Sequence, residues 1–133
     1  MSRSLTSSTI SSVRSGEAET FPEAISVIVT PWRRLLVDHD FASGCPLAAT
    51  ICDAAANDSL RTHVSELLAR WRAPVADAYT RFGAPQAEAE AQATVLMAAL
   101  EGALMLARAQ RNIEPLDTVE RFFASRAPDP RRA

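Results

Sequence analysis

The chain has 133 residues, 47% of them hydrophobic, which is enough for one hydrophobic core and predicts a single domain. Its formal net charge of −2 excludes a global electrostatic attraction to nucleic acid or to an anionic membrane. Two cysteines and an N-terminus without a secretory pattern lead us to expect a cytoplasmic protein.

Three regions are predicted along the chain. Residues 1–19 are rich in Ser and Thr and poor in large apolar side chains, so we expect a disordered leader. A helical domain is predicted at residues 20–126, followed by a polar, proline-containing tail at 127–133. Thr20 and Glu23 have the spacing of a capping box, which marks the start of the first helix.

The first two predicted helices both contain proline. One runs from about residue 22 to 38 and has Pro31 inside it, so we expect a kink or a late start. The other begins after Gly44, with Pro46 in its first turn, and continues to residue 56. We expect this second helix to be short and mostly buried.

The third predicted helix is amphipathic. A cap at Asn57 or Asp58 begins it, and Gly83 ends it by adopting a left-handed conformation. Pro74 lies inside, where we expect a bend. Apolar residues recur every three or four positions over six turns. They are Leu60, Val64, Leu67, Leu68, Trp71, Val75, Ala78, Tyr79 and Phe82.

The fourth predicted helix, residues 85–111, is apolar or small on almost every side between its charged ends. One face must therefore pack on its own domain and the other on a partner, which indicates an oligomer. Its most apolar stretch is interrupted by Glu101 and is too short to span a bilayer. A fifth helix begins near Pro115 and carries one apolar stripe that includes Phe123.

Four segments occur in an order and spacing similar to one branch of the TetR transcriptional repressors. They are FASGCPLAA at residues 41–49, the helix at 60–73 ending in ARWR, AALEGALMLARA at 98–109, and PLD at 115–117. Over residues 32–123 the chain resembles the C-terminal domain of LmrA/YxaF-like regulators. This resemblance implies an all-α antiparallel bundle of five helices, in which the last two form a four-helix bundle with a second subunit.

The resemblance also implies a truncated regulator. Family members normally begin with a DNA-binding helix-turn-helix, and the corresponding space here holds the Ser/Thr-rich leader. We therefore expect no specific DNA binding by this chain. Two explanations are open for the missing module. In the first, a helix-turn-helix is encoded upstream of Met1. In the second, the chain pairs with a full-length TetR-type regulator and blocks its DNA binding. A stand-alone small-molecule-binding protein is the alternative outside transcription.

A small apolar effector is expected to bind among the first four helices. The alternative is that the aromatic residues fill the core and that Glu101 makes a structural hydrogen bond. Pro31 and Pro74 affect the shape of such a pocket. The candidate ligand-binding residues are Trp32, Leu36, Phe41, Cys45, Trp71, Tyr79, Met97 and Glu101.

A homodimer is expected, because a stripe of small residues on the fourth helix lets a partner helix approach closely. The candidate interface residues are Val95, Ala98, Gly102, Met105, Ala109, Phe122 and Phe123. The opposite stripe is expected to face the subunit's own core, and the reverse assignment is the alternative. That opposite stripe comprises Leu96, Leu100, Ala103, Leu104 and Ala107.

No residue pattern indicates catalysis, a cofactor or a metal site. The sequence offers no nucleophile with a base and no clustered glycines, so we expect no enzyme. Cys45 and Cys52 are interpreted as core residues rather than metal ligands or redox sensors. His39 lies in an acidic cluster that suits a solvated helix end better than a metal.

Overall fold

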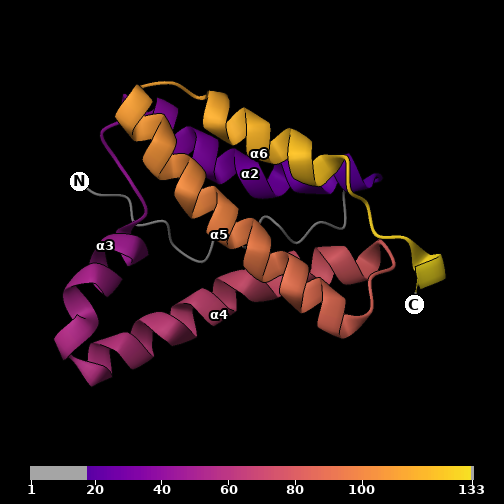
Figure 1. The fold of residues 1–133 in the computed structure, drawn as a ribbon, viewed down its shortest axis with the longest axis horizontal. Coiled ribbons are helices and arrows are strands. Elements are labelled where there is room, and N and C mark those ends of the chain that lie inside the picture. Colours follow the sequence, from indigo (N-terminus) through magenta and orange to yellow (C-terminus); the bar gives the residue numbers. More distant parts are fainter. Residues whose placement is uncertain (1–17, 133) are drawn as a thin grey trace.

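The computed structural model describes residues 18–132, and over that range the chain is helical, without a strand (Figure 1). This confirms the predicted all-α class and the five α-helices. The α-helices are α2 (Phe21–Val37), α3 (Pro46–Asp53), α4 (Asp58–Arg81), α5 (Gln86–Gln110) and α6 (Glu114–Ala124), and short 3-10 turns occupy Ala54–Ala56 and Pro130–Arg132.

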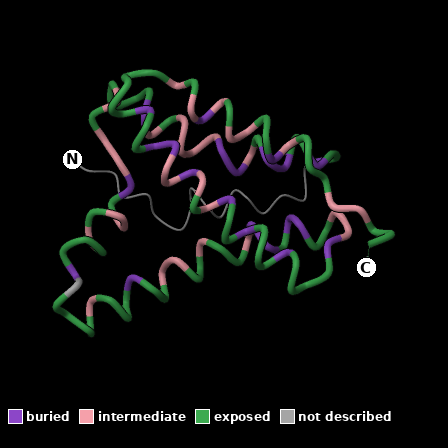
Figure 2. The backbone as a smooth tube through the Cα atoms, viewed as in Figure 1, coloured by how far each residue is buried: buried purple, intermediate pink, exposed green. Residues whose placement is uncertain are grey.

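The helices form two unequal parts. Helices α2, α5 and α6 pack together with the second half of α4, and α2 and α6 lie side by side (Figure 1). Helices α4 and α5 meet near their connection and diverge toward α3. Figure 2 shows buried segments in the packed part, whereas α3 and the first half of α4 are mostly exposed or half-buried. We call α3 and the first half of α4 the α3–α4 arm.

Helix α2 begins at the predicted cap. The Glu23 backbone N–H donates to the Thr20 hydroxyl, and the Thr20 N–H donates to the Glu23 carboxylate, each at 3.4 Å. The helix starts at Phe21 and continues past Pro31, so the late start that we expected is wrong. Its β-branched residues Ile25 and Val29 are fully buried, and this burial outweighs their weak helix propensity.

The described residues begin just before α2. Ala18 is buried, and its carbonyl accepts a hydrogen bond of 2.6 Å from the Arg81 guanidinium. The rest of the predicted leader up to residue 17 lies outside the described residues, so the predicted domain boundary stays a prediction.

Helix α3 is not the buried helix that we predicted. None of its residues is buried, and it ends at Asp53 before a 3-10 turn. Cys45, just before the helix, is buried, whereas Cys52 is exposed. The expectation of a core position is thus correct for Cys45 and wrong for Cys52. Helix α3 packs against α4 and leaves its other side open.

Helix α4 has the predicted ends. The Asn57 side chain accepts a hydrogen bond of 3.0 Å from the Leu60 N–H, and Gly83 follows the helix with a φ of +103°. The helix continues through Pro74. Its second half is buried around Tyr79, but Val64 is the one buried residue in its first half.

Helix α5 has two different apolar faces. The face that we expected to meet the core does so, because Leu96, Leu100, Ala103, Leu104 and Ala107 are all buried. On other sides of the helix, large apolar side chains remain exposed, led by Met105 at 71%. By length and composition alone, α5 could cross a membrane, so the expectation that its apolar stretch is too short is wrong. In this structure α5 packs on α4 and α6 through one buried face.

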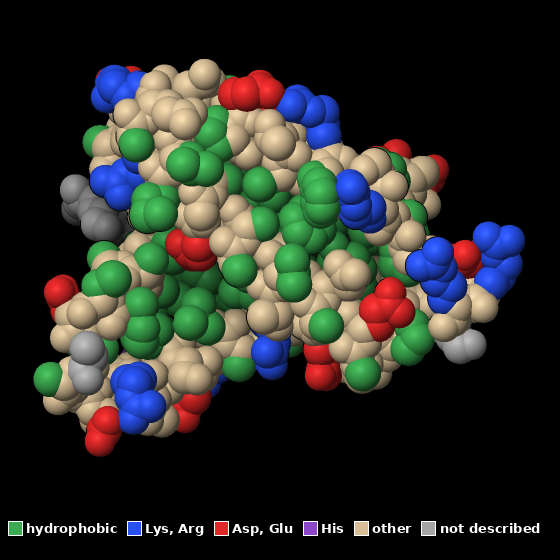
Figure 3. Space-filling view, viewed as in Figure 1, with side chains coloured by type: hydrophobic (Ala, Val, Ile, Leu, Met, Phe, Trp, Pro, Cys, Tyr) green, Lys and Arg blue, Asp and Glu red, His purple; other side chains and the backbone are tan. Residues whose placement is uncertain are grey.

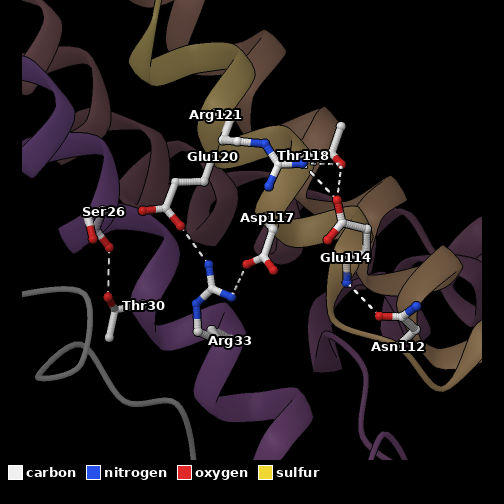
Figure 4. A network of polar contacts seen from close by, with 9 residues as sticks. All are labelled: Ser26, Thr30, Arg33, Asn112, Glu114, Asp117, Thr118, Glu120 and Arg121. Carbon is white, nitrogen blue, oxygen red and sulfur yellow. Dashed lines mark hydrogen bonds and ion pairs between the residues drawn. The ribbon is translucent and has the colours of Figure 1, made fainter.

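An ionic cluster fastens α2 to α6 (Figure 4). The Arg33 guanidinium donates to the Asp117 carboxylate and, at 2.6 Å, to the Glu120 carboxylate. Burial by itself lowers the pKa of Arg33, but hydrogen bonding and attraction from the two carboxylates outweigh burial and raise it. The cluster is about one-third exposed, so its contribution to stability is moderate.

Replacing Arg33 with Met is expected to lower the free energy of unfolding by about 1–2 kcal/mol, because two neighbouring carboxylates lose their shared cation. Urea denaturation followed by circular dichroism measures this loss. Arg34→Met, at an exposed position one residue along α2, is the matched control. Equal losses in the two variants would show that the α2–α6 cluster contributes nothing specific.

Candidate functional site

An apolar hollow lies between the α3–α4 arm and α5, and Figure 3 shows hydrophobic side chains gathered around it. It consists of two cavities of about 370 and 530 Å³ that share the Glu101 side chain. Each volume falls in the range of small-molecule sites. The lining is mainly apolar and comes from Leu68, Ala69, Met97 and Ala98 on one side and Cys45, Ala48, Ala49, Leu104 and Met105 on the other.

Polar residues on the α5 wall of the hollow are spaced seven apart. They are Thr94, Glu101 and Arg108, and a seven-residue spacing places them in line at intervals of roughly 10 Å. Apolar residues of α5 occupy the wall between them. The central position belongs to the carboxylate, and the basic residue lies at one end.

Glu101 and Cys45 form the polar centre of the hollow. Each side chain shifts the pKa of the other, so the thiol lies beside the carboxylate. Burial raises the pKa of Glu101, and the hydrogen bond from Cys45 opposes that rise. Burial, followed by the hydrogen bond to Glu101, raises the pKa of Cys45 to about 11. At neutral pH the thiol is therefore protonated and is a poor nucleophile.

Replacing Glu101 with Gln should stabilise the fold by about 0.5–1 kcal/mol at neutral pH, because the amide removes a charge that burial disfavours. A raised pKa in the folded state means that the wild-type residue is most favourable below its ordinary pKa of 4.5 and loses that advantage as the pH rises. The stability difference between variant and wild type should therefore grow from pH 4.5 to pH 7, as measured by urea denaturation. A constant difference would contradict the burial of this charge.

The loop between α2 and α3 holds Cys45 in place. Two of its residues, Asp40 and Phe41, have positive φ values of 49° and 60°. The Arg111 guanidinium at the end of α5 donates to the Asp40 carboxylate at 2.9 Å, and Arg108 donates to the Ala42 carbonyl at 3.1 Å. These contacts join the end of α5 to the loop, so Cys45 is fixed beside the hollow.

Arg108 passes close to Gly44 where it crosses the loop. A Cβ atom at Gly44 would lie 2.5 Å from the Arg108 guanidinium, so a larger residue there would shift the flexible end of that side chain.

The predicted ligand-binding residues separate into three groups. Cys45, Met97 and Glu101 line the hollow. Leu36 and Tyr79 do not, because they are at most 1% exposed within the core. Phe21 packs edge-on against Tyr79 at 5.3 Å between ring centres, and burial raises the pKa of Tyr79 to about 12. These two residues therefore lie outside the hollow, and their role in binding a ligand stays a prediction.

The remaining aromatic candidates are half-buried. Trp32 of α2 and Trp71 of α4 make an edge-to-face contact with ring centres 6.4 Å apart. Phe41 packs against the core from the loop. None of the three lines either cavity, so they support the base of the arm.

Sequence reasoning missed much of the arm's contribution to the hollow. Leu68 and Ala69 of α4 and Ala48 of α3 line it, although none was a candidate. Leu68 belongs to the predicted apolar face of α4, and that face was the available signal. Helical periodicity shows that a face is apolar but not whether a ligand or another helix covers it.

A second apolar surface lies on the outer side of α5. We call it the ridge and define it as Val95, Ala98, Gly102, Leu106 and Ala109 of α5 with Phe122 of α6. Val95, Leu106 and Phe122 are between 49% and 56% exposed. Leu106 was not a candidate.

Two of the predicted interface residues lie elsewhere. Phe123 is 5% exposed and belongs to the subunit's own core, so it does not contribute to the ridge. Met105 is exposed, but it lines the hollow. Gly102 belongs to the ridge and also lines the hollow, and a Cβ atom there would meet nothing within 4 Å.

Metal ligands do not gather in the described part of the chain: residues 18–132 contain no group of three His, Cys, Asp or Glu side chains suited to a metal ion. His39 and the neighbouring aspartates are exposed.

The sequence matches the family model for the C-terminal domain of LmrA/YxaF-like transcriptional regulators over residues 22–122. The chain belongs to this family. Two curated relatives, uncharacterized HTH-type transcriptional regulators of Mycobacterium tuberculosis strains H37Rv and CDC 1551, are each 32% identical over 112 residues. These alignments cover 79% of this chain and 57% of each relative. No solved structure matches.

Membership accounts for the architecture. The matched range begins one residue inside α2 and ends within α6, so the five helices together are an LmrA/YxaF-like C-terminal domain. The family consists of transcriptional regulators.

Proposed function

We propose that this LmrA/YxaF-like domain is the effector-binding and dimerisation domain of a TetR-type regulator in the cytoplasm. A small, mainly apolar molecule occupies the hollow beside Glu101, and two copies pair through the ridge. The observation that carries the proposal is the placement of hollow and ridge on adjoining sides of one helix, α5.

The shared residues give a physical route between ligand and dimer. Ala98 and Gly102 belong to the ridge and also line the hollow. A ligand that presses on this side of α5 must shift the same backbone that the partner subunit contacts. Coupling of this kind requires that the ligand bind one arrangement of the helices better than the other.

The exposed α3–α4 arm is suited to close over a ligand. Most of its residues are exposed or half-buried, and the arm and α5 diverge (Figure 2). A ligand between them would bury apolar surface on both walls, and this burial is the main source of affinity for an apolar molecule.

Binding of the neutral apolar dye N-phenyl-1-naphthylamine tests the hollow. Its fluorescence should rise in the presence of the protein, and Leu68→Lys should weaken its binding about tenfold or more by placing a charge in the apolar lining. Val37→Lys, at an apolar position that is 57% exposed on α2, is the matched control and should bind like wild type.

Circular dichroism must show that both lysine variants fold. Equal dye binding by Leu68→Lys and wild type would place the dye outside the hollow and contradict this assignment.

A further inference from the structure

Glu101 is the one acidic residue in the lining of either cavity, and it lies where the two cavities meet. The side chain that interacts with it there is the Cys45 thiol, a neutral group that leaves acceptor positions on the carboxylate for a ligand. Most other lining residues are apolar. The centre of the hollow thus presents a partly desolvated negative charge against apolar walls.

The two arginines of the lining do not neutralise this charge. Arg72 donates to the Thr94 hydroxyl at 3.5 Å, and Arg108 donates to the Ala42 carbonyl. Neither makes an ion pair with Glu101 among residues 18–132. Both arginines are exposed, so water screens their charges more than it screens the half-buried carboxylate.

We propose that the effector of this hollow is a lipophilic cation: an apolar molecule that carries a single positive charge, such as a protonated or quaternary amine. This inference rests on the proposed function and names its ligand class. The positive group lies beside the Glu101 carboxylate, and the apolar body contacts Leu68, Met97 and Ala48. A cation supplies the charge partner that the protein itself leaves out.

Cys45 is compatible with this selectivity. Its thiol lies beside Glu101, and burial keeps the thiol protonated, so it adds no second negative charge. An anion of the same shape would meet the carboxylate at the centre of the hollow. The carboxylate therefore selects ligands by charge, and the apolar walls select them by size.

Tetraphenylphosphonium and tetraphenylborate are suitable probes, because they have nearly the same shape and opposite charges. Isothermal titration calorimetry with the full chain should show that the phosphonium binds about tenfold more tightly or better than the borate. Glu101→Gln should weaken phosphonium binding about tenfold and bring the two affinities within about threefold. Glu101→Asp should retain the preference for the cation, and Glu66→Gln, at an exposed position of α4, should leave both affinities unchanged.

Equal binding of the two ions by wild type, or a preference for the borate, would overturn the proposal without requiring any variant. Phosphonium binding that is unaffected by Glu101→Gln would also overturn it. The neutral dye separates this failure from that of the proposed function. If dye binding depends on Leu68 but the two ions bind equally, the hollow is a ligand site for uncharged molecules. Loss of both would reject the hollow itself.

Discussion

Replacing Gly102 with Leu is expected to convert a dimeric protein into a monomer at micromolar concentration. Gly102 lies in the middle of the ridge, where the missing side chain lets a partner helix approach the α5 backbone. A leucine there would hold the partner away, and overpacking of this kind costs about 1–3 kcal/mol, which corresponds to a dimer that is about 5- to 150-fold weaker. Sedimentation equilibrium measures the change in dissociation constant.

The folded subunit should tolerate this substitution. A Cβ atom at Gly102 meets nothing within 4 Å, so the first atom of the new side chain has room inside the subunit. Glycine in a helix is also about 1 kcal/mol less favourable than alanine, so leucine should strengthen α5 itself. A monomer with unchanged or higher intrinsic stability is the expected combination.

Two variants serve as controls for the Gly102 result. Gly102→Ala should weaken the dimer less than Gly102→Leu, because the added side chain is smaller. Glu66→Leu places the same large side chain on the exposed side of α4 and should leave the dimer intact. A Gly102→Leu protein that dimerises as tightly as wild type would place the interface away from the ridge.

Replacing Leu100 with Ala should have the opposite pattern of effects. Leu100 is 1% exposed on the core face of α5, and removing such a side chain leaves a cavity that costs about 2–5 kcal/mol. The free energy of unfolding should fall by that amount, as measured by urea denaturation, while folded subunits pair as before. Leu106→Ala, at a residue of the same helix that is 51% exposed, should cost the subunit much less.

Dimerisation adds to the apparent stability of a protein, so the two effects need separation. Comparing Leu100→Ala with its parent in the monomeric Gly102→Leu background makes unfolding independent of protein concentration. A loss below about 1 kcal/mol in that background would contradict the assignment of Leu100 to the core.

Features that depend on neighbouring residues were predictable from the sequence. The Thr20–Glu23 capping box, the Asn57 cap and the stop at Gly83 all appear where the pattern placed them. The core stripe of α5 was also predictable, because large apolar residues gather on that side. In each case, the determining residues lie within a few turns of one another.

Features that depend on distant packing were not predictable. Helix α3 is apolar, yet its residues are exposed or half-buried, because among residues 18–132 it packs mainly against α4 and the following 3-10 turn. Leu36 and Tyr79 were predicted to bind a ligand, and in the structure they are buried in the core. The periodicity of a helix reveals its apolar face and leaves open what that face contacts.

The candidate site shows the same division. A carboxylate within an apolar helix identified Glu101 from the sequence as a residue that needs a partner. That its partner is Cys45 follows from the loop between α2 and α3, where Asp40 and Phe41 adopt positive φ and the arginines at the end of α5 hold the chain. Asp40 and Phe41 could not be recognised from the sequence as positive-φ positions, because neither residue type favours positive φ as strongly as glycine does.

The central claim is that the ridge of α5 is covered by a second copy of the chain. The most direct measurement is the molar mass of the wild-type protein by light scattering across a range of concentrations. We expect a mass of twice the 14.4 kDa of one chain at micromolar concentration and above. A mass of 14.4 kDa throughout that range would contradict the account.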